Sequence, residues 1–153
     1  PVAGTHGGPV AGAHGGPGSI ELALEARRPR RVLAAHAVGH VRAAHDRSEG
    51  GLAVALAELV LRDGVGLRAT LPARRGAGTL AALFGEGPSG IVLVVPPEHA
   101  DALGALAAAR DVPLWTLGTV GGDILEIAPV LGMPVAALRA AFDGGLARSL
   151  GRA

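Results

Sequence analysis

The chain has 153 residues, of which 49% are hydrophobic, 18% charged and 2% aromatic, and its formal net charge is +1. This length suits one domain, and the apolar fraction excludes a chain that is disordered throughout. No apolar run is long enough to span a bilayer, and a near-neutral charge without a basic stripe gives no support for nucleic-acid binding. Cysteine is absent, which excludes disulfides and thiolate metal sites. The sequence therefore predicts a cytoplasmic protein with no membrane partner and no nucleic-acid partner.

Residues 1–18 differ in composition from the rest. The octapeptide PVAGTHGG at 1–8 is followed by PVAGAHGG at 9–16. Because glycine is entropically costly to order and proline lacks a backbone donor, we expect a flexible lead-in over 1–18 and a folded domain over 19–153. His6 and His14 offer imidazoles for a weak Cu(II) or Ni(II) site, so a metal-binding repeat is one alternative function. The first residue is Pro1, as expected if an initiator methionine is removed or if the chain is a piece of a longer protein.

Hydrophobic periodicity predicts the elements of the first half in chain order. We expect two short helices, or one helix kinked at Pro29, over 20–38, and a strand over 41–45. The next helix, over about 51–62, is predicted by apolar residues at helical spacing: Leu52, Ala55, Leu56, Leu59 and Val60. Its other face is also mostly apolar, so this helix is expected to be buried on most sides. A strand follows over 66–71.

The second half predicts strands around one further helix. Residues 91–95 form a continuous β-branched and leucine run, which is typical of a strand covered on both faces. A helix over 98–110 then leads to a strand over 112–119, which implies a right-handed crossover and parallel pairing. Gly121-Gly122 predicts a hairpin turn into a strand over 123–128. A C-terminal helix is marked by Val135, Leu138, Phe142 and Leu146. Together the elements predict an α+β (α/β layered) fold, a mixed β-sheet with helices packed on it, partly ferredoxin-like.

The most informative segment is AHDRSEGGLAVALAE at 44–58. A predicted strand ends there at His45-Asp46, a polar bend follows, and Gly50-Gly51 leads into the helix. Backbone amides at a helix start favour an anion, and the two glycines let the backbone approach a ligand closely. The side chains of Asp46, Ser48 and Glu49 can hydrogen-bond hydroxyls, hold a metal ion or cap the helix. Spacing alone leaves a ligand loop and a capped helix start both open.

This segment resembles the signature AHD-x-S-D-G-G-L-A-V-A-L-A-E of the large subunit of phosphoribosylformylglycinamidine synthase, in the aminoimidazole-ribonucleotide-synthetase-like superfamily. LFGEGPSGIVLVVPPEHADAL at 83–103 is similar to that family's LF-x-E…V-x-V-P-P-E segment, and VPLWTLGTVGGDILEI at 112–127 is similar to its VP…IGTVGGD-x-L-x-I segment. With the terminal helix the resemblance covers about 41–150. It implies a C-terminal domain with the fold of the C-terminal domain of aminoimidazole ribonucleotide synthetase.

The resemblance implies part of an ATP-dependent amidoligase, a carbon–nitrogen ligase with glutamine as amide donor. The family converts formylglycinamide ribonucleotide, ATP and glutamine-derived ammonia to formylglycinamidine ribonucleotide in de novo purine biosynthesis. The implied cofactors are ATP and Mg²⁺, held mainly by upstream domains of the same large subunit. The implied partners are those domains, a glutaminase subunit or domain, and a small-molecule nucleotide substrate. We therefore expect one wall of an inter-domain ligand cleft, inactive in isolation.

The residues predicted to bind substrate or phosphate in that wall are His45, Asp46, Ser48, Glu49, Gly50, Gly51 and Glu86. No catalytic residue and no metal ligand is predicted. Glu86 lies in a turn rich in Gly and Pro, and it faces either the cleft beside the Asp46 loop or solvent. Two departures from the family pattern matter: Glu49 stands where Asp is usual, and Gly90 stands where an Arg or similar polar residue is usual. A fixed cation for phosphate is thus expected to be missing.

Two other functions stay open beside the metal-binding repeat. The first is a non-catalytic assembly or scaffold domain, in which the bend merely caps a helix. The second is another member of the same ATP-dependent superfamily, of the hydrogenase-maturation or selenophosphate-synthesis type. The GTVGGD and PPE segments argue against this second alternative.

Overall fold

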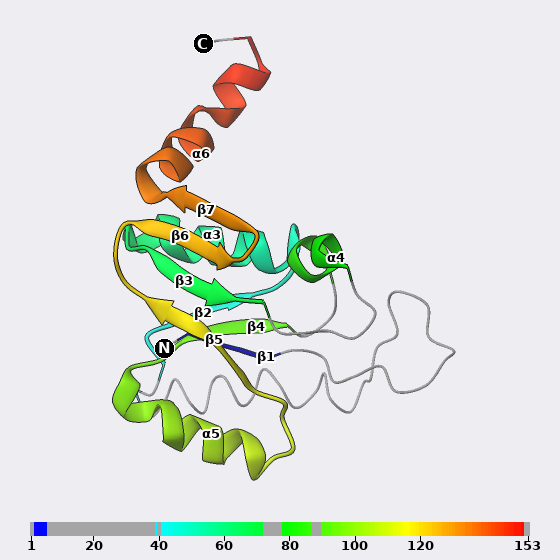
Figure 1. Cartoon of the computed structure of the whole chain (residues 1–153), viewed down its shortest axis with the longest axis vertical. Coiled ribbons are helices and arrows are strands. Elements are labelled where there is room, and N and C mark those ends of the chain that lie inside the picture. Colours follow the sequence, from blue (N-terminus) through cyan, green and yellow to red (C-terminus); the bar gives the residue numbers. More distant parts are fainter. Residues whose placement is uncertain (1, 6–38, 40, 72–77, 87–89, 152–153) are drawn as a thin grey trace, which may run out of the picture.

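The computed structural model describes residues 2–5, 39, 41–71, 78–86 and 90–151 (Figure 1). The helices expected over 20–38 lie outside this part of the chain, as do His6 and His14. The elements in chain order are β1 (Val2–Thr5), β2 (Ala43–Asp46), α3 (Gly51–Asp63), β3 (Leu67–Thr70), α4 (Thr79–Phe84), β4 (Ile91–Val94), the 3-10 turn η1 (Pro97–His99), α5 (Ala100–Ala108), β5 (Trp115–Val120), β6 (Ile124–Ala128), β7 (Leu131–Pro134) and α6 (Val135–Ser149).

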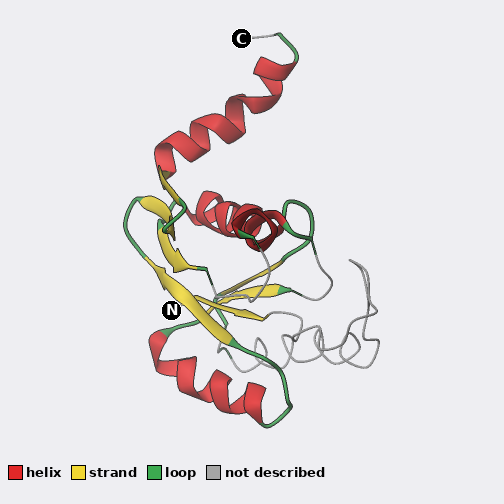
Figure 2. Cartoon of the chain, turned by 45° about the vertical axis from the view of Figure 1, so that its right-hand side comes forward, coloured by secondary structure: helices red, strands yellow, loops and turns green. Residues whose placement is uncertain are grey.

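The described strands form one seven-stranded sheet in the order β2-β4-β1-β5-β3-β6-β7. The β3–β6 pair is parallel, whereas the other pairs are antiparallel. Helices α3 and α4 lie on one face of the sheet and α5 lies on the other (Figure 2). This arrangement confirms the predicted α+β class, with a mixed sheet and helices packed on it.

The core has two parts, one on each face of the sheet. The larger part packs α3 against the strands, and Leu56 and Ile127 in it are fully buried at 0% exposure. The smaller part packs α5 against β4. Along β4 the side chains alternate, so that Val92 belongs to the first part and Leu93 to the second. The prediction that the run at 91–95 is covered on both faces is confirmed.

Strand β1 corrects two expectations. Val2–Thr5, expected to be part of a flexible lead-in, instead lies inside the sheet, between β4 and β5 and antiparallel to both. A strand in this position needs only backbone hydrogen bonds on both edges, which small non-proline residues supply as well as large ones. The second expectation was parallel pairing between the strands predicted at 91–95 and 112–119. These strands, β4 and β5, run in the same direction across α5, but they do not pair because β1 lies between them.

The predicted hairpin at Gly121-Gly122 is also wrong. Strands β5 and β6 are not neighbours, because β3 lies between them, antiparallel to β5 and parallel to β6. The connection between β5 and β6 crosses the start of β3 instead, where the Gly66 amide donates to Gly122 O and Gly66 O accepts from the Gly121 amide, both at 2.8 Å. A Cβ at Gly66 would lie 2.6 Å from the Ile124 backbone, so glycine is required at this crossing.

Helix α4, strand β7 and the exposure of α6 were not predicted. Helix α6 begins where the predicted C-terminal helix begins and projects away from the sheet (Figure 1). Only Val135 of α6 is buried. Phe142 and Leu146 are 62% and 73% exposed. None of the described helices is long and apolar enough to cross a membrane.

Candidate ligand site at the start of helix α3

Along the end of β2 and into the polar bend, residues 46–51, side chains alternate between buried and exposed positions. Ala43 and Arg47 are buried and His45 is half-buried, whereas Asp46 and Ser48 are exposed. Side chains of consecutive strand residues point to opposite sides. The bend therefore presents Asp46 and Ser48 to solvent, while His45 and Arg47 anchor it from behind.

The two glycines of the bend have different roles. Gly50 and Gly51 both have a left-handed backbone, with φ of 74° and 69°. A Cβ at Gly51 would also lie 2.7 Å from Leu83 O and 2.9 Å from the Phe84 Cα. The backbone that Gly51 approaches is thus the end of α4, which locks this short helix against the start of α3. The close approach expected of these glycines is used at Gly51 by the chain's own packing.

Glu86 is brought to the bend from the far end of α4. Its Oε1 accepts the Gly50 amide at 3.1 Å, while the Gly51 amide donates to Ser48 O at 3.2 Å. A carboxylate that accepts a backbone amide at a helix start is well placed electrostatically. The structure therefore gathers Glu86 with the consecutive residues 45–51, although 36 positions separate it from Gly50.

The side chains of the bend do not cap α3 within the described residues. The residue that caps the helix is Gly50, which has no side chain to offer. Asp46, Ser48 and Glu49 are exposed, and no described hydrogen bond joins their side chains to the amides of the first helical turn. Their oxygens are therefore available at the surface, which is the arrangement a ligand loop needs.

Arg47 was missed by the sequence reasoning. It is the buried charged residue of the described chain, at 8% exposure. Its amide donates to Gly90 O at 2.6 Å, and a Cβ at Gly90 would lie 2.9 Å from the Arg47 Cβ and 3.0 Å from its Nε. The Arg47 side chain thus occupies the space that a side chain at 90 would need.

His45 uses both ring nitrogens inside the chain. Its Nδ1 lies 2.7 Å from Asp46 O, and its Nε2 lies 2.9 Å from Glu58 Oε2 on α3. Its ring also lines an open groove of about 360 Å³ between α3 and α6, to which Glu58, Arg62, Arg139 and Phe142 contribute. Both polar side-chain atoms of His45 are therefore engaged within the chain.

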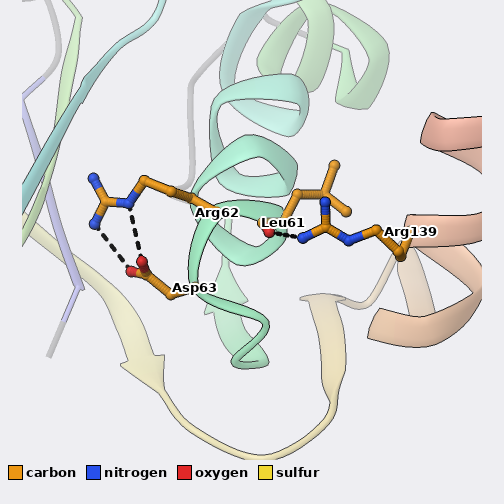
Figure 3. A network of polar contacts seen from close by, with 4 residues as sticks. All are labelled: Leu61, Arg62, Asp63 and Arg139. Carbon is orange, nitrogen blue, oxygen red and sulfur yellow. Dashed lines mark hydrogen bonds and ion pairs between the residues drawn. The ribbon is translucent and has the colours of Figure 1, made fainter.

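The other end of α3 carries a separate polar network (Figure 3). Arg62 and Asp63 form two hydrogen bonds of 3.0 Å. The Arg62 guanidinium lowers the pKa of Asp63, and the carboxylate raises the pKa of Arg62. Arg139 of α6 donates to Leu61 O, which ties the two helices together at the last carbonyls of α3. This network lies a full helix length away from the bend.

Metal binding receives no support from the described side chains. No three His, Cys, Asp or Glu residues of the described part gather closely enough to hold an ion. The bend offers carboxylates and a hydroxyl at the surface but no preformed cage. Its exposed carboxylate and hydroxyl oxygens can accept hydrogen bonds from the hydroxyl groups of a ligand.

Comparison with known proteins gives the bend its context. Residues 6–128 match the family model described as "AIR synthase related protein, C-terminal domain". The chain is 42% identical over 125 residues to phosphoribosylformylglycinamidine synthase subunit PurL of Brucella ovis, an alignment that covers 82% of this chain and 16% of that protein. It thus spans about a sixth of the length of this relative.

Solved structures agree on the fold. PurL of Thermotoga maritima complexed with ATP superimposes with a TM-score of 0.69 at 19% identity, over 90% of this chain and 25% of that one. The PurLQS structure from the same organism gives a TM-score of 0.72 at 18% identity, with the same coverage. The family match extends over most of the chain and includes the bend, α3, Glu86 and the sheet around them. The chain therefore belongs to the family of AIR synthase related C-terminal domains.

Proposed function

We propose that this chain is the C-terminal domain of an ATP-dependent phosphoribosylformylglycinamidine synthase and forms one wall of an inter-domain ligand cleft. The observation that carries the proposal is the bend at the start of α3. It presents the exposed side chains of Asp46, Ser48 and Glu49, and it is joined to Glu86 through the Gly50 amide. The 42% identity to a PurL subunit supplies the reaction class.

In this proposal the bend orients and binds, and it does not act as the chemical base. The Asp46 carboxylate would accept hydrogen bonds from ribose or ribonucleotide hydroxyls, and the Ser48 hydroxyl would donate or accept them. The Gly50-Gly51 backbone would lie beside phosphate. ATP and Mg²⁺ would be held mainly by upstream domains, as the resemblance to the synthase family implies. A glutaminase subunit or domain would supply ammonia, and we place the assembly in the cytoplasm.

The test reconstitutes the cleft from two polypeptides. The 153-residue chain is mixed with the upstream domains of the same large subunit, and formylglycinamidine ribonucleotide formation is measured with ammonia as donor. Loss of a hydrogen bond to a charged group is worth about 1.5–3 kcal/mol, so Asp46→Asn should lower kcat/KM by about tenfold to a hundredfold. Ser48→Ala should lower it by less, because its hydroxyl bonds are neutral.

Asp101→Asn is the matched control, because Asp101 is an exposed aspartate on α5, across the sheet from the bend. It should leave kcat/KM unchanged. If Asp46→Asn and Ser48→Ala both behave like Asp101→Asn while the mixture is active, the bend is no part of the cleft. The chain then serves assembly alone.

An assembly role has an observation of its own. Phe142 and Leu146 lie four residues apart on α6 and Leu150 directly follows the helix; they are 62%, 73% and 58% exposed. Large apolar residues gathered on one helix face are typical of a surface that another domain covers. Phe142→Ser should then prevent association with the upstream domains, measured by sedimentation, whereas Asp46→Asn should leave association intact.

A further inference from the structure

The His45 ring makes two contacts that together determine its protonation. Nδ1 lies 2.7 Å from the Asp46 carbonyl oxygen, and Nε2 lies 2.9 Å from Glu58 Oε2. A carbonyl oxygen can only accept a hydrogen bond, and an ionised carboxylate can only accept as well. Both close contacts are favourable when both ring nitrogens donate, and only the imidazolium form of histidine carries a proton on each. The ring is positive when both hydrogen bonds are formed.

The charges around the ring agree with a cation. The Asp46 carboxylate lies 3.7 Å from Nδ1, and Glu58 approaches from α3, so two acidic groups face the ring. Arg62 and Arg139 line the same groove, but Arg62 is paired with Asp63 and Arg139 is bonded to Leu61 O. A neutral ring would present a lone pair to one of its two acceptors, which is repulsive. Among the described groups, the carboxylates of Asp46 and Glu58 thus favour the charged form, while the two arginine charges are directed to their own partners.

The two contacts connect the elements on either side of the bend. His45 belongs to β2 and immediately precedes Asp46. Glu58 lies on α3, about two turns after Gly51. One hydrogen bond holds the last peptide of β2, and the other holds the body of α3. Residues 47–50 span the gap between these two fixed points, so the direction in which Asp46 and Ser48 face depends on the distance that His45 sets.

We propose that His45 is a positioning residue, an imidazolium clamp that holds β2 against α3 and thereby orients the bend, and that it does not contact the ligand. Its polar atoms are consumed inside the chain, and its half-buried ring leaves Asp46 and Ser48 as the outward groups. The clamp itself rests on these two contacts alone. Its effect on ligand binding rests on the function proposed above.

The clamp is tested on the 153-residue chain by nitrogen-15 NMR of the histidine rings at neutral pH. We expect both ring nitrogens of His45 to resonate at similar, protonated positions, whereas a neutral tautomer separates them widely. His45→Gln identifies the signals. Glu58→Gln keeps the size of the partner but removes its charge, and it should remove the protonated signature of His45. His99→Gln, on η1 beyond the opposite face of the sheet, should leave it unchanged.

The consequence for binding is measured in the two-polypeptide mixture. Glu58→Gln and His45→Gln should each raise the KM for the nucleotide substrate by about tenfold, and the double variant should be no worse than either single one. A neutral His45 in the unmodified chain, or additive effects of the two substitutions, would overturn the clamp. If the ring is charged but Asp46→Asn has no effect on activity, the clamp stands and the function proposed for the bend fails.

Where His45→Gln does not fold, Glu58→Gln carries the test, because Glu58 is exposed and glutamine keeps its hydrogen-bonding oxygen. A purely structural role for His45 predicts lower thermal stability with an unchanged KM. A positioning role predicts the change in KM, together with shifts of the backbone amide signals of Ser48 to Gly51. The two roles are therefore distinguished by measurements on the same variant.

Discussion

Helices α3 and α6 touch each other yet have opposite surroundings. α3 spans 13 residues and buries most of them between the sheet and its neighbours, whereas α6 spans 15 residues and buries only Val135. Both carry apolar residues at helical spacing. The difference shows that such spacing indicates an apolar face, but does not reveal whether the described chain covers that face. The backbone of the bend before α3 packs closely against the end of α4 at Gly51, whereas only Val135 of α6 is buried.

The largest effect should come from truncating the centre of α3. Leu56→Ala removes a side chain that is 0% exposed, so it should lower the free energy of unfolding by about 2–5 kcal/mol. The same substitution at Leu146, which is 73% exposed, should change it by less than about 0.5 kcal/mol. Urea denaturation monitored at Trp115 measures both. Equal losses would mean that Leu146 is covered in solution.

Glycine replacements sharpen the contrast between the two helices. Gly51→Ala forces a Cβ into a left-handed position and against the α4 backbone at 2.7 Å. The expected loss is about 2–5 kcal/mol, the sum of conformational strain and overpacking. Gly145 lies inside α6, with no described atom within 4 Å of the added Cβ. Gly145→Ala should therefore stabilise the chain by about 0.5–1 kcal/mol. Thermal unfolding of the two variants should shift in opposite directions.

The sequence predicted which elements are buried better than it predicted which strands pair with each other. The apolar run at 91–95 identified a strand covered on both faces, and the apolar residues of 51–62 identified a buried helix. Whether two strands pair, however, depends on whether a third lies between them, and that is decided by contacts far apart in the chain. Both pairing errors, across β1 and across β3, have this cause.

The candidate site likewise combines residues that local sequence patterns predict with residues brought there by contacts between distant parts of the chain. The consecutive residues 45–51 could be proposed from local pattern, because a strand, a polar bend and two glycines are neighbours in sequence. Glu86 came from resemblance alone, since no local signal links it to Gly50. Arg47 was overlooked, although strand alternation from Ala43 through His45 predicts an inward side chain at that position. Extending the two-residue period past the end of β2 would have found it.

A smaller loss of stability is expected from a substitution at Gly90, against which the Arg47 side chain packs. Gly90→Ala places a Cβ 3.0 Å from Nε of the buried Arg47, and overpacking of this kind costs about 1–3 kcal/mol. Arg47→Ala removes the Nε contact but keeps the Arg47 Cβ, which would lie 2.9 Å from the added Cβ. It should therefore relieve only part of that loss, with a coupling of about 0.5–3 kcal/mol in the double-mutant cycle. Denaturation of the two single variants and the double variant gives the coupling directly.

Helix α6 offers the matched control for this pair. A Cβ at Gly144 would lie 2.5 Å from Nη1 of Arg148, but Arg148 is exposed and its guanidinium can move into solvent. Gly144→Ala should therefore be neutral or slightly stabilising, because alanine favours helix. A loss as large as that of Gly90→Ala would show that Arg148 is held as firmly as Arg47. The contrast between the packed bend and α6 would then fail.

The smallest effect concerns the exposed ion pair at the end of α3. Because Arg62 lowers the pKa of Asp63, the folded chain gains stability from the ionised carboxylate above the ordinary aspartate pKa, and loses it as pH falls through the lowered value. Both side chains are more than half exposed, at 53% and 56%, so solvent screening limits the gain to a few tenths of a kcal/mol. Arg62→Gln should lower the free energy of unfolding by this small amount at neutral pH and low salt, and the difference should shrink in strong acid.

Arg148→Gln on α6 is the control, because the Arg148 guanidinium donates to Ala141 O, a partner that does not titrate. It should show no such pH dependence. Urea titrations at neutral and acidic pH compare the two variants, and an equal pH dependence at Arg148 would trace the effect to the helix terminus instead of the ion pair.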